Sequence, residues 1–155
     1  MMKTKNLERY LNSFANNVLK DSKSILKSTK GSTKLASSLR TEVSPDPNGF
    51  SVRFYMADYG TFVDKGVSGN KNPISYTDGT KIKSSPYKYT TKQPPSSVLD
   101  KWIVKKGIAP RDEKGRFVSR KSIAFLIARS IKIKGIKSTS FFSRPLGIRY
   151  EELQK

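Results

Sequence analysis

The sequence predicts an α+β fold in which a small antiparallel sheet, built on a hairpin, is flanked by an N-terminal helix and two C-terminal helices. Three observations predict this arrangement. Apolar residues recur at helical spacing over residues 5–28, polar and apolar residues alternate over residues 50–56, and helical spacing returns after residue 96. Periods of about 3.6 and about 2 residues distinguish amphipathic helices from half-buried strands.

The first predicted element, over residues 5–28, is an amphipathic helix. Its apolar side chains are spaced four, three, four and seven residues apart, which places them on one stripe. They are Leu7, Leu11, Phe14, Val18 and Ile25. The rest of the helix surface is polar and includes Asn12, Asn16, Lys20, Lys23 and Lys27. Gly31 is the predicted stop, and a short second helix follows with Leu35, Ala36 and Leu39 on one face.

A β-hairpin is the next predicted element. Its first strand runs from Thr41 to Ser44, and the turn cluster from Pro45 to Gly49 connects it to the second strand. In the second strand apolar and polar side chains alternate, as expected of a strand with one buried face. The apolar positions are Phe50, Val52, Phe54 and Met56.

The stretch from Tyr55 to Gly69 combines large apolar residues with closely spaced glycines, and locally it predicts a turn that leaves a strand. Residues 68–95 then form a long polar loop or insertion, a feature that is usually functional in a small domain. Its tyrosines, Tyr76, Tyr87 and Tyr89, predict a partner-binding loop. We expect this segment to be mobile in the free subunit and ordered by a neighbour; a flexible insertion is the alternative.

Two helices are predicted in the C-terminal part. A capping-box variant at residues 97–100 opens the first, which ends at Gly107. The side chains on its shared face are Leu99, Trp102 and Ile103. Ser119 caps the second helix, which runs to about Lys134 and is terminated by Gly135. Its inward side chains are Ile123, Leu126, Ile127 and Ile131.

Length and composition bound the function. The 155 residues predict a single domain, 1–155, with a modest core. The net charge is +19, and such an excess favours a polyanion or an acidic protein as neighbour. An AT-rich genome is a second explanation for the many lysines. The chain has no Cys and no His, which excludes thiolate chemistry and removes the commonest general base. No signal peptide and no membrane span are expected.

The positive charge is concentrated in the C-terminal half. Between residues 81 and 144 there are seventeen basic residues and only three acids, Asp100, Asp112 and Glu113. Sequence-independent contact with DNA is therefore expected, with acidic protein surfaces as the alternative. The residues predicted to face DNA are Lys101, Lys105, Lys106, Arg129, Lys132 and Lys134. A helix-turn-helix is disfavoured because the connection between the two helices is too long.

Catalytic patterns are weak. Residues 24–27 match Ser-x-x-Lys, but the companion motifs of acyl-enzymes are missing. Asp46 and Asp112 could imitate the carboxylates of a metal-dependent nuclease, yet both lie in predicted turns more than sixty residues apart. No nucleophile, base and oxyanion donor come together. We therefore expect no enzyme, no cofactor and no metal, although a small enzyme of another type and a basic nucleic-acid-binding module stay as alternatives.

Three short segments carry a family resemblance. Residues 31–39 are similar to a Gly-x-Leu-x-x-Ser-hydrophobic stretch, and residues 59–66 match Tyr-small-x-x-Val-acid-x-Gly. Residues 138–146 resemble a C-terminal Pro-x-Phe-hydrophobic-x-Pro-Ala element, with Thr139 or Ser140 for the first proline and Leu146 for the alanine. In this order the segments resemble the tail-completion (neck) proteins of tailed double-stranded DNA phages. The stretch from about residue 68 to 135 is longer than that family typically has.

The resemblance implies a structural virion protein at the head–tail junction, made in the cytoplasm of a host bacterium. It implies a homo-oligomeric ring that docks the tail onto the portal and lines or closes the DNA channel, with portal and tail proteins as partners. Tail-completion, head-closure and short-tailed-phage ring proteins all fit. The predicted subunit interface is Tyr59, Phe62, Val63, Asp64 and Gly66. Asp64 is expected to form an intersubunit ion pair or an N-cap.

Overall fold

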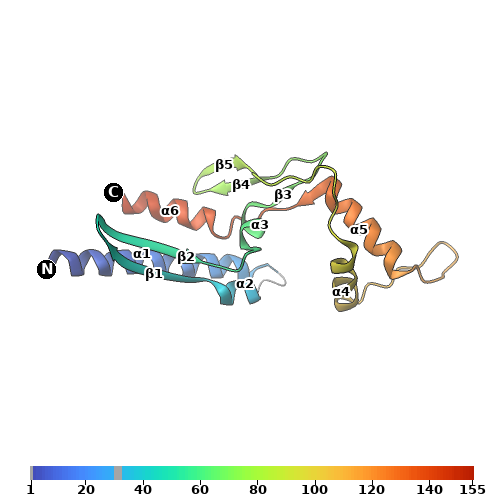
Figure 1. Ribbon diagram of the computed structural model, residues 1–155, viewed down its shortest axis with the longest axis horizontal. Coiled ribbons are helices and arrows are strands. Elements are labelled where there is room, and N and C mark those ends of the chain that lie inside the picture. The colour runs from blue at the N-terminus through green and yellow to red at the C-terminus, as the bar shows by residue number, and fades with distance from the viewer. Residues whose placement is uncertain (1, 30–32) are drawn as a thin grey trace.

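The computed structural model describes residues 2–29 and 33–155. Helices α1 (Met2–Lys27) and α6 (Ser143–Leu153) pack together, and both chain ends lie at the same end of an elongated molecule (Figure 1). The hairpin of β1 (Arg40–Asp46) and β2 (Gly49–Tyr55) packs on α1. The short helix α2 (Thr33–Ser38) also contacts α1. The predicted helix stop at Gly31 lies outside the described residues.

The α+β prediction is confirmed, and so is the predicted hairpin. Its strands pair from Arg40 opposite Tyr55 to Asp46 opposite Gly49. Only two residues remain between the strands, so the turn is tighter than predicted. The backbone N–H of Asn48 donates to a carboxylate oxygen of Asp46 at 2.7 Å, the local bond that favours aspartate at turns. The Ser51 hydroxyl and this Asn48 N–H together lower the pKa of the Asp46 carboxyl.

The middle of the chain contains short elements that link the two ends of the molecule. Helix α3 (Gly60–Lys65) leads into β3 (Val67–Ser68), which pairs antiparallel with β6 (Gly135–Ile136). A second hairpin, β4 (Ser75–Asp78) with β5 (Lys81–Ser84), lies over α6 (Figure 1). In the described residues the strands therefore form three separate two-stranded sheets.

Helices α4 (Ser96–Lys106) and α5 (Arg120–Lys134) form a projecting pair, which we call the arm, residues 96–134 (Figure 1). Ser119 caps α5 as predicted, since its hydroxyl accepts the Ser122 N–H at 3.3 Å. Gly107 ends α4 in the left-handed conformation, also as predicted. The predicted capping box of α4 is wrong: the helix starts at Ser96 after Pro95, with no side-chain cap.

Two separate apolar clusters stabilise the molecule. We call the described residues outside the arm the body. The buried side chains of its cluster are Leu26, Leu35, Leu39 and Phe141. In the arm, the buried side chains are Ile103, Ile123 and Ala124. Leu126, which was predicted to point inward, is 58% exposed. Trp102, which was predicted to share a face with Ile103, is 43% exposed, whereas Ile103 is buried.

Several elements were not expected from the sequence: α3, the β3–β6 pair, the β4–β5 hairpin and α6. Within the predicted polar loop of residues 68–95, residues 75–78 and 81–84 pair as the strands β4 and β5. Helix α6 does have a helical signal that sequence analysis can find. Pro145 stands in its first turn, and Leu146, Tyr150 and Leu153 follow at helical spacing.

Candidate assembly surfaces

A buried carboxylate joins α3 to the start of α6. The side chain of Asp64 is only 3% exposed. One of its oxygens accepts the backbone N–H groups of Phe142 at 3.0 Å and Ser143 at 2.9 Å, and the other accepts the Ser143 hydroxyl. Asp64 therefore caps α6 from across the fold, where the helix N-terminus has backbone donors and a partial positive charge.

Backbone contacts extend this junction. The N–H and hydroxyl of Thr139 both donate to the carbonyl of Val63, at 3.0 and 2.8 Å. The Ser140 N–H donates to the backbone carbonyl of Asp64 at 2.9 Å. Thus residues 63–64 and residues 139–143, far apart in the sequence, form one hydrogen-bonded unit.

These contacts correct part of the predicted subunit interface. The carboxylate of Asp64 is hydrogen-bonded within the subunit, so it is not available for an intersubunit ion pair. The alternative prediction for Asp64 was an N-cap, and the helix that Asp64 caps is α6. Gly66 is buried at φ 70°, and a Cβ there would lie 2.6 Å from the carbonyl oxygen of Ile136. Val63 is half-buried against the body core.

Tyr59 and Phe62 are the predicted interface residues with large exposed surfaces, at 47% and 43%. The ring of Phe62 lies 4.6 Å from the ring of Tyr87, and the ammonium of Lys65 lies 5.7 Å from the ring of Tyr76. The structure therefore brings the predicted interface and the predicted partner-binding loop together. We call Tyr59, Phe62, Tyr76 and Tyr87 the aromatic surface.

The loop that carries these tyrosines is bonded to the rest of the subunit. The Ser68 N–H donates to the carbonyl of Tyr87 at 2.9 Å, and the Tyr89 N–H donates to the carbonyl of Ser68 at 2.8 Å. Gly79 packs on Gly147 of α6, where a Cβ on Gly147 would lie 2.5 Å from the Gly79 nitrogen. Partial burial raises the pKa of the Tyr89 hydroxyl. Tyr89 is thus a packing residue of this segment.

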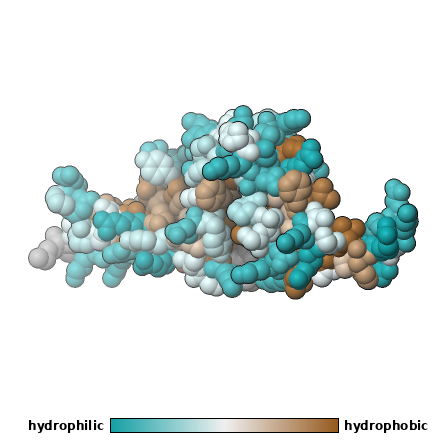
Figure 2. Space-filling view, turned by 45° about the vertical axis from the view of Figure 1, so that its right-hand side comes forward, coloured by the Kyte–Doolittle hydropathy of each residue, from teal (hydrophilic) through white to brown (hydrophobic). Residues whose placement is uncertain are grey.

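The arm exposes many apolar side chains, which Figure 2 shows as brown areas between hydrophilic ones on the side that carries it. They are Val98, Trp102, Val104, Phe117, Phe125 and Leu126. Helix α5 is therefore apolar both toward α4 and away from it. Phe125 and Leu126 form what we call the outer face of α5, where apolar side chains are exposed among basic ones. Exposed apolar patches rimmed by polar residues are typical of contact surfaces.

The basic residues predicted to face DNA lie among these apolar side chains. Lys101, Lys105 and Lys106 are exposed on α4, and Arg129 and Lys134 are exposed on α5. Lys132 is half-buried, and the carbonyl of its backbone accepts the Asn70 N–H at 2.8 Å. The arm therefore combines positive charge with exposed apolar area.

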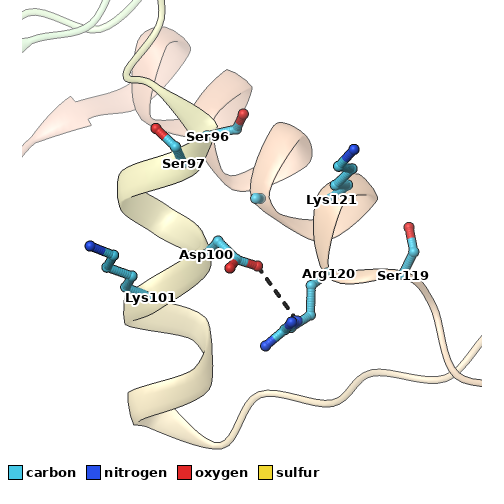
Figure 3. Close-up of a pocket in the computed structure, with 8 residues that line it drawn as sticks. Ser96, Ser97, Asp100, Lys101, Ser119, Arg120 and Lys121 are labelled. Carbon is cyan, nitrogen blue, oxygen red and sulfur yellow. Dashed lines mark ion pairs between the residues drawn. The ribbon is translucent and has the colours of Figure 1, made fainter.

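A hollow of about 570 Å³ lies where α4 and α5 begin. Figure 3 shows Arg120 reaching toward Asp100 across it, and their nearest atoms are 3.5 Å apart. Ser96, Ser97, Lys101 and Lys121 also line it. The hollow is open to solvent, and its only acid is already paired with an arginine.

Other kinds of site were sought in the part of the chain that the structure describes. There, no three side chains of the metal-binding types come together. Asp46 and Asp112 are each bonded within their own turns. None of the described helices has the length and apolar character needed to cross a membrane. In comparisons with known proteins, no family model matches the chain, and neither a characterised protein nor a solved structure is significantly similar to it.

Proposed function

We propose that this protein is a structural subunit of the head–tail junction of a tailed double-stranded DNA phage. In this role it forms a ring that docks the tail onto the portal and lines or closes the DNA channel. The protein's work is mechanical and involves no covalent chemistry.

One observation carries the proposal: the three segments that resemble phage neck proteins converge in one place. Leu35 and Leu39, from the first segment, pack in the same core as Phe141, from the last. Asp64, from the central segment, caps the helix that follows Phe141. Their convergence supports reading them as one structural signature, because the parts of such a signature have to meet in the fold.

The shape and the surfaces support a ring as well. A ring with rotational symmetry needs two different faces on each subunit, one for each neighbour. The aromatic surface and the outer face of α5 are two such faces, on different parts of an elongated molecule (Figure 1). Both expose large apolar side chains, which are typical of the centre of a protein–protein contact.

Electron microscopy of the purified protein, alone and with portal assemblies, tests the proposal. We expect rings in at least one of these samples, and we expect Phe62→Asp to abolish them. Because Phe62 is exposed, this variant should keep the helix content of the wild type, measured by circular dichroism. Rings formed equally well by Phe62→Asp would remove the aromatic surface from the interface. A protein that stays monomeric with and without portal assemblies would contradict the proposed function.

A second candidate function is a basic, sequence-independent nucleic-acid-binding protein. It is favoured by the net charge of +19 and by the long exposed basic surfaces of the molecule. One simple observation distinguishes the two functions. A binding module would act without forming rings and would be absent from purified virions, whereas a junction subunit would be present there at a fixed copy number.

A further inference from the structure

The exposed face of α1 is a continuous basic stripe. Each residue of the stripe follows the one before it by three or four positions, so all of them lie along one line of the helix. The basic members are Lys5, Arg9, Lys20, Lys23 and Lys27, with Asn12 and Asn16 between them. All seven are exposed except Lys23, which is half-buried. The opposite face holds Ala15, Val18 and Leu26 in the body.

Few acids lie near the stripe. Glu8 is exposed and borders its N-terminal end, three positions after Lys5 and four before Asn12. Asp21 is already engaged, since its carboxylate accepts a hydrogen bond from Arg149 of α6 at 2.9 Å. Within the described residues, none of the five basic side chains of the stripe is paired with a carboxylate. Their charge is therefore available to a ligand.

The stripe has the dimensions of a DNA contact. At a rise of about 1.5 Å per residue, Lys5 and Lys27 are about 33 Å apart along the helix, close to the length of one turn of B-DNA, about 34 Å. Its C-terminal half borders a shallow hollow of about 510 Å³, lined by Asn16, Leu19, Lys20, Lys23, Ser24 and Lys27. A straight helix laid along the axis of a duplex would cross each phosphate strand about once over this length.

The composition of the stripe favours DNA over other polyanions as the ligand. A helix that binds a membrane surface needs an apolar face toward the lipid. The body covers the apolar face of α1 at Ala15, Val18 and Leu26 and leaves only Leu7 and Tyr10 about half exposed. Four of its five basic residues are lysines, which attract phosphates as point charges rather than through the bidentate geometry of arginine. Because contacts to phosphates carry no sequence information, we expect binding independent of sequence.

The arm is the weaker candidate for this ligand. Its lysines alternate with Val98, Trp102 and Val104, which are more than 40% exposed. Apolar side chains facing a phosphate backbone find no apolar surface there to cover them. They suit a protein neighbour better, as proposed above for the outer face of α5.

We infer that double-stranded DNA lies along the exposed face of α1, held by Lys5, Arg9, Lys20, Lys23 and Lys27. The inference deepens the proposed function, because packaged DNA is the polyanion of a head–tail junction. It stands on the α1 surface itself, so it can be tested with purified protein and DNA alone.

Two charge-matched variants test it. One carries Lys20→Gln, Lys23→Gln and Lys27→Gln on α1; the other carries Lys101→Gln, Lys105→Gln and Lys106→Gln on α4. Binding to a random-sequence duplex several helical turns long is measured by fluorescence anisotropy over a range of salt concentrations. We expect the α1 variant to reduce the slope of log K against log salt by about 2.7, since each lost phosphate contact removes about 0.9. The α4 variant should keep the wild-type slope.

Three outcomes would overturn the inference: a wild-type protein that does not bind the duplex, an α1 variant with the wild-type slope, or an α4 variant with the larger loss. Circular dichroism of both variants shows whether the helices are intact. Ring formation is scored separately by electron microscopy. Rings without DNA binding would reject the α1 surface and leave the assembly proposal standing, and DNA binding without rings would do the opposite.

Discussion

At the scale of single residues, Asp64 has the largest structural role among the acids of this chain. It accepts hydrogen bonds from two backbone N–H groups and one hydroxyl, all at the start of α6. A buried carboxyl group is tolerated because these donors replace its hydration. Removing the side chain would leave the donors buried without a partner.

We expect Asp64→Ala to lower the free energy of unfolding by about 2–4 kcal/mol, since it removes three hydrogen bonds to a buried side chain and a helix cap together. Urea denaturation followed by circular dichroism measures the effect. Asp58→Ala is the matched control, because Asp58 is an exposed acid six positions earlier in the chain. It should change the free energy of unfolding by less than about 0.5 kcal/mol. Equal losses in the two variants would contradict the capping role.

Gly135 is the second residue with a sharp prediction. It ends α5 at φ 79°, and a Cβ there would lie 2.2 Å from the carbonyl oxygen of Val67. Gly115 has a similar φ of 77° with nothing within 4 Å, so it is a control for backbone strain alone. Gly115→Ala should cost about 1–2 kcal/mol, and Gly135→Ala should cost about 1–3 kcal/mol more because the backbone must move. Thermal unfolding of both variants measures the difference, and equal costs would show that β3 and β6 separate easily.

At the scale of elements, α5 is unusual because it is apolar on two faces. Ile123 is 7% exposed in the arm core, whereas Leu126, three positions later, is 58% exposed. A residue inside a core contributes to folding, and an exposed apolar residue contributes only when a partner covers it. Substitutions of these two side chains therefore test stability and assembly independently on one helix.

We expect Ile123→Ala to destabilise the arm by about 2–5 kcal/mol. Leu126→Ala should change stability by less than about 0.5 kcal/mol yet reduce ring formation. Denaturant unfolding and electron microscopy of the two variants measure these effects. Normal rings from Leu126→Ala and Phe125→Ala together would show that the outer face of α5 is not a subunit contact.

The β4–β5 segment behaves differently from what its polar composition predicts. Its backbone groups bond to β3 and to α6, so part of the ordering entropy is offset within the subunit itself. We expect the amides of Ser68 and Tyr89 to exchange slowly with solvent in the free protein, whereas those of Thr91 and Lys92, in the exposed stretch before α4, exchange fast. Hydrogen–deuterium exchange with mass spectrometry measures this. Fast exchange at Ser68 and Tyr89 would restore the original expectation of a mobile loop.

At the scale of the whole molecule, two cores are joined by short connections. The body core and the arm core share no residue. The connections are the β3–β6 pair and the chain that leads into α4. Small cores with few links between them are expected to open separately rather than in one cooperative step.

Trp102 makes this testable, since it is the only tryptophan of the chain and lies on α4. We expect Ile103→Ala to shift the fluorescence transition of Trp102 to lower urea concentration while the main circular dichroism transition stays near its wild-type midpoint. Leu35→Ala, in the body core, should shift the circular dichroism transition instead. Coincident transitions in both variants would mean that the molecule unfolds as a single cooperative unit.

Local patterns determined much of this protein. Several features depend on residues that are close together along the chain. They are the periods of α1, β2 and α5, the turn at residues 45–49, the Ser119 cap and the Gly107 stop. They could be predicted because helix, strand and cap preferences depend on neighbours a few positions away. The basic character of the surface was likewise determined by composition.

The tertiary structure alone decided which of these residues are free to meet a partner. Asp64 and Phe62 stand two positions apart in one motif, yet the first is buried under α6 and the second is exposed beside Tyr87. The residues of the outer face of α5 and of the basic stripe of α1 are present in the sequence, but their exposure depends on which elements pack nearby. Burial is set by contacts between segments distant in the sequence, and the periodicity of a single segment does not contain that information.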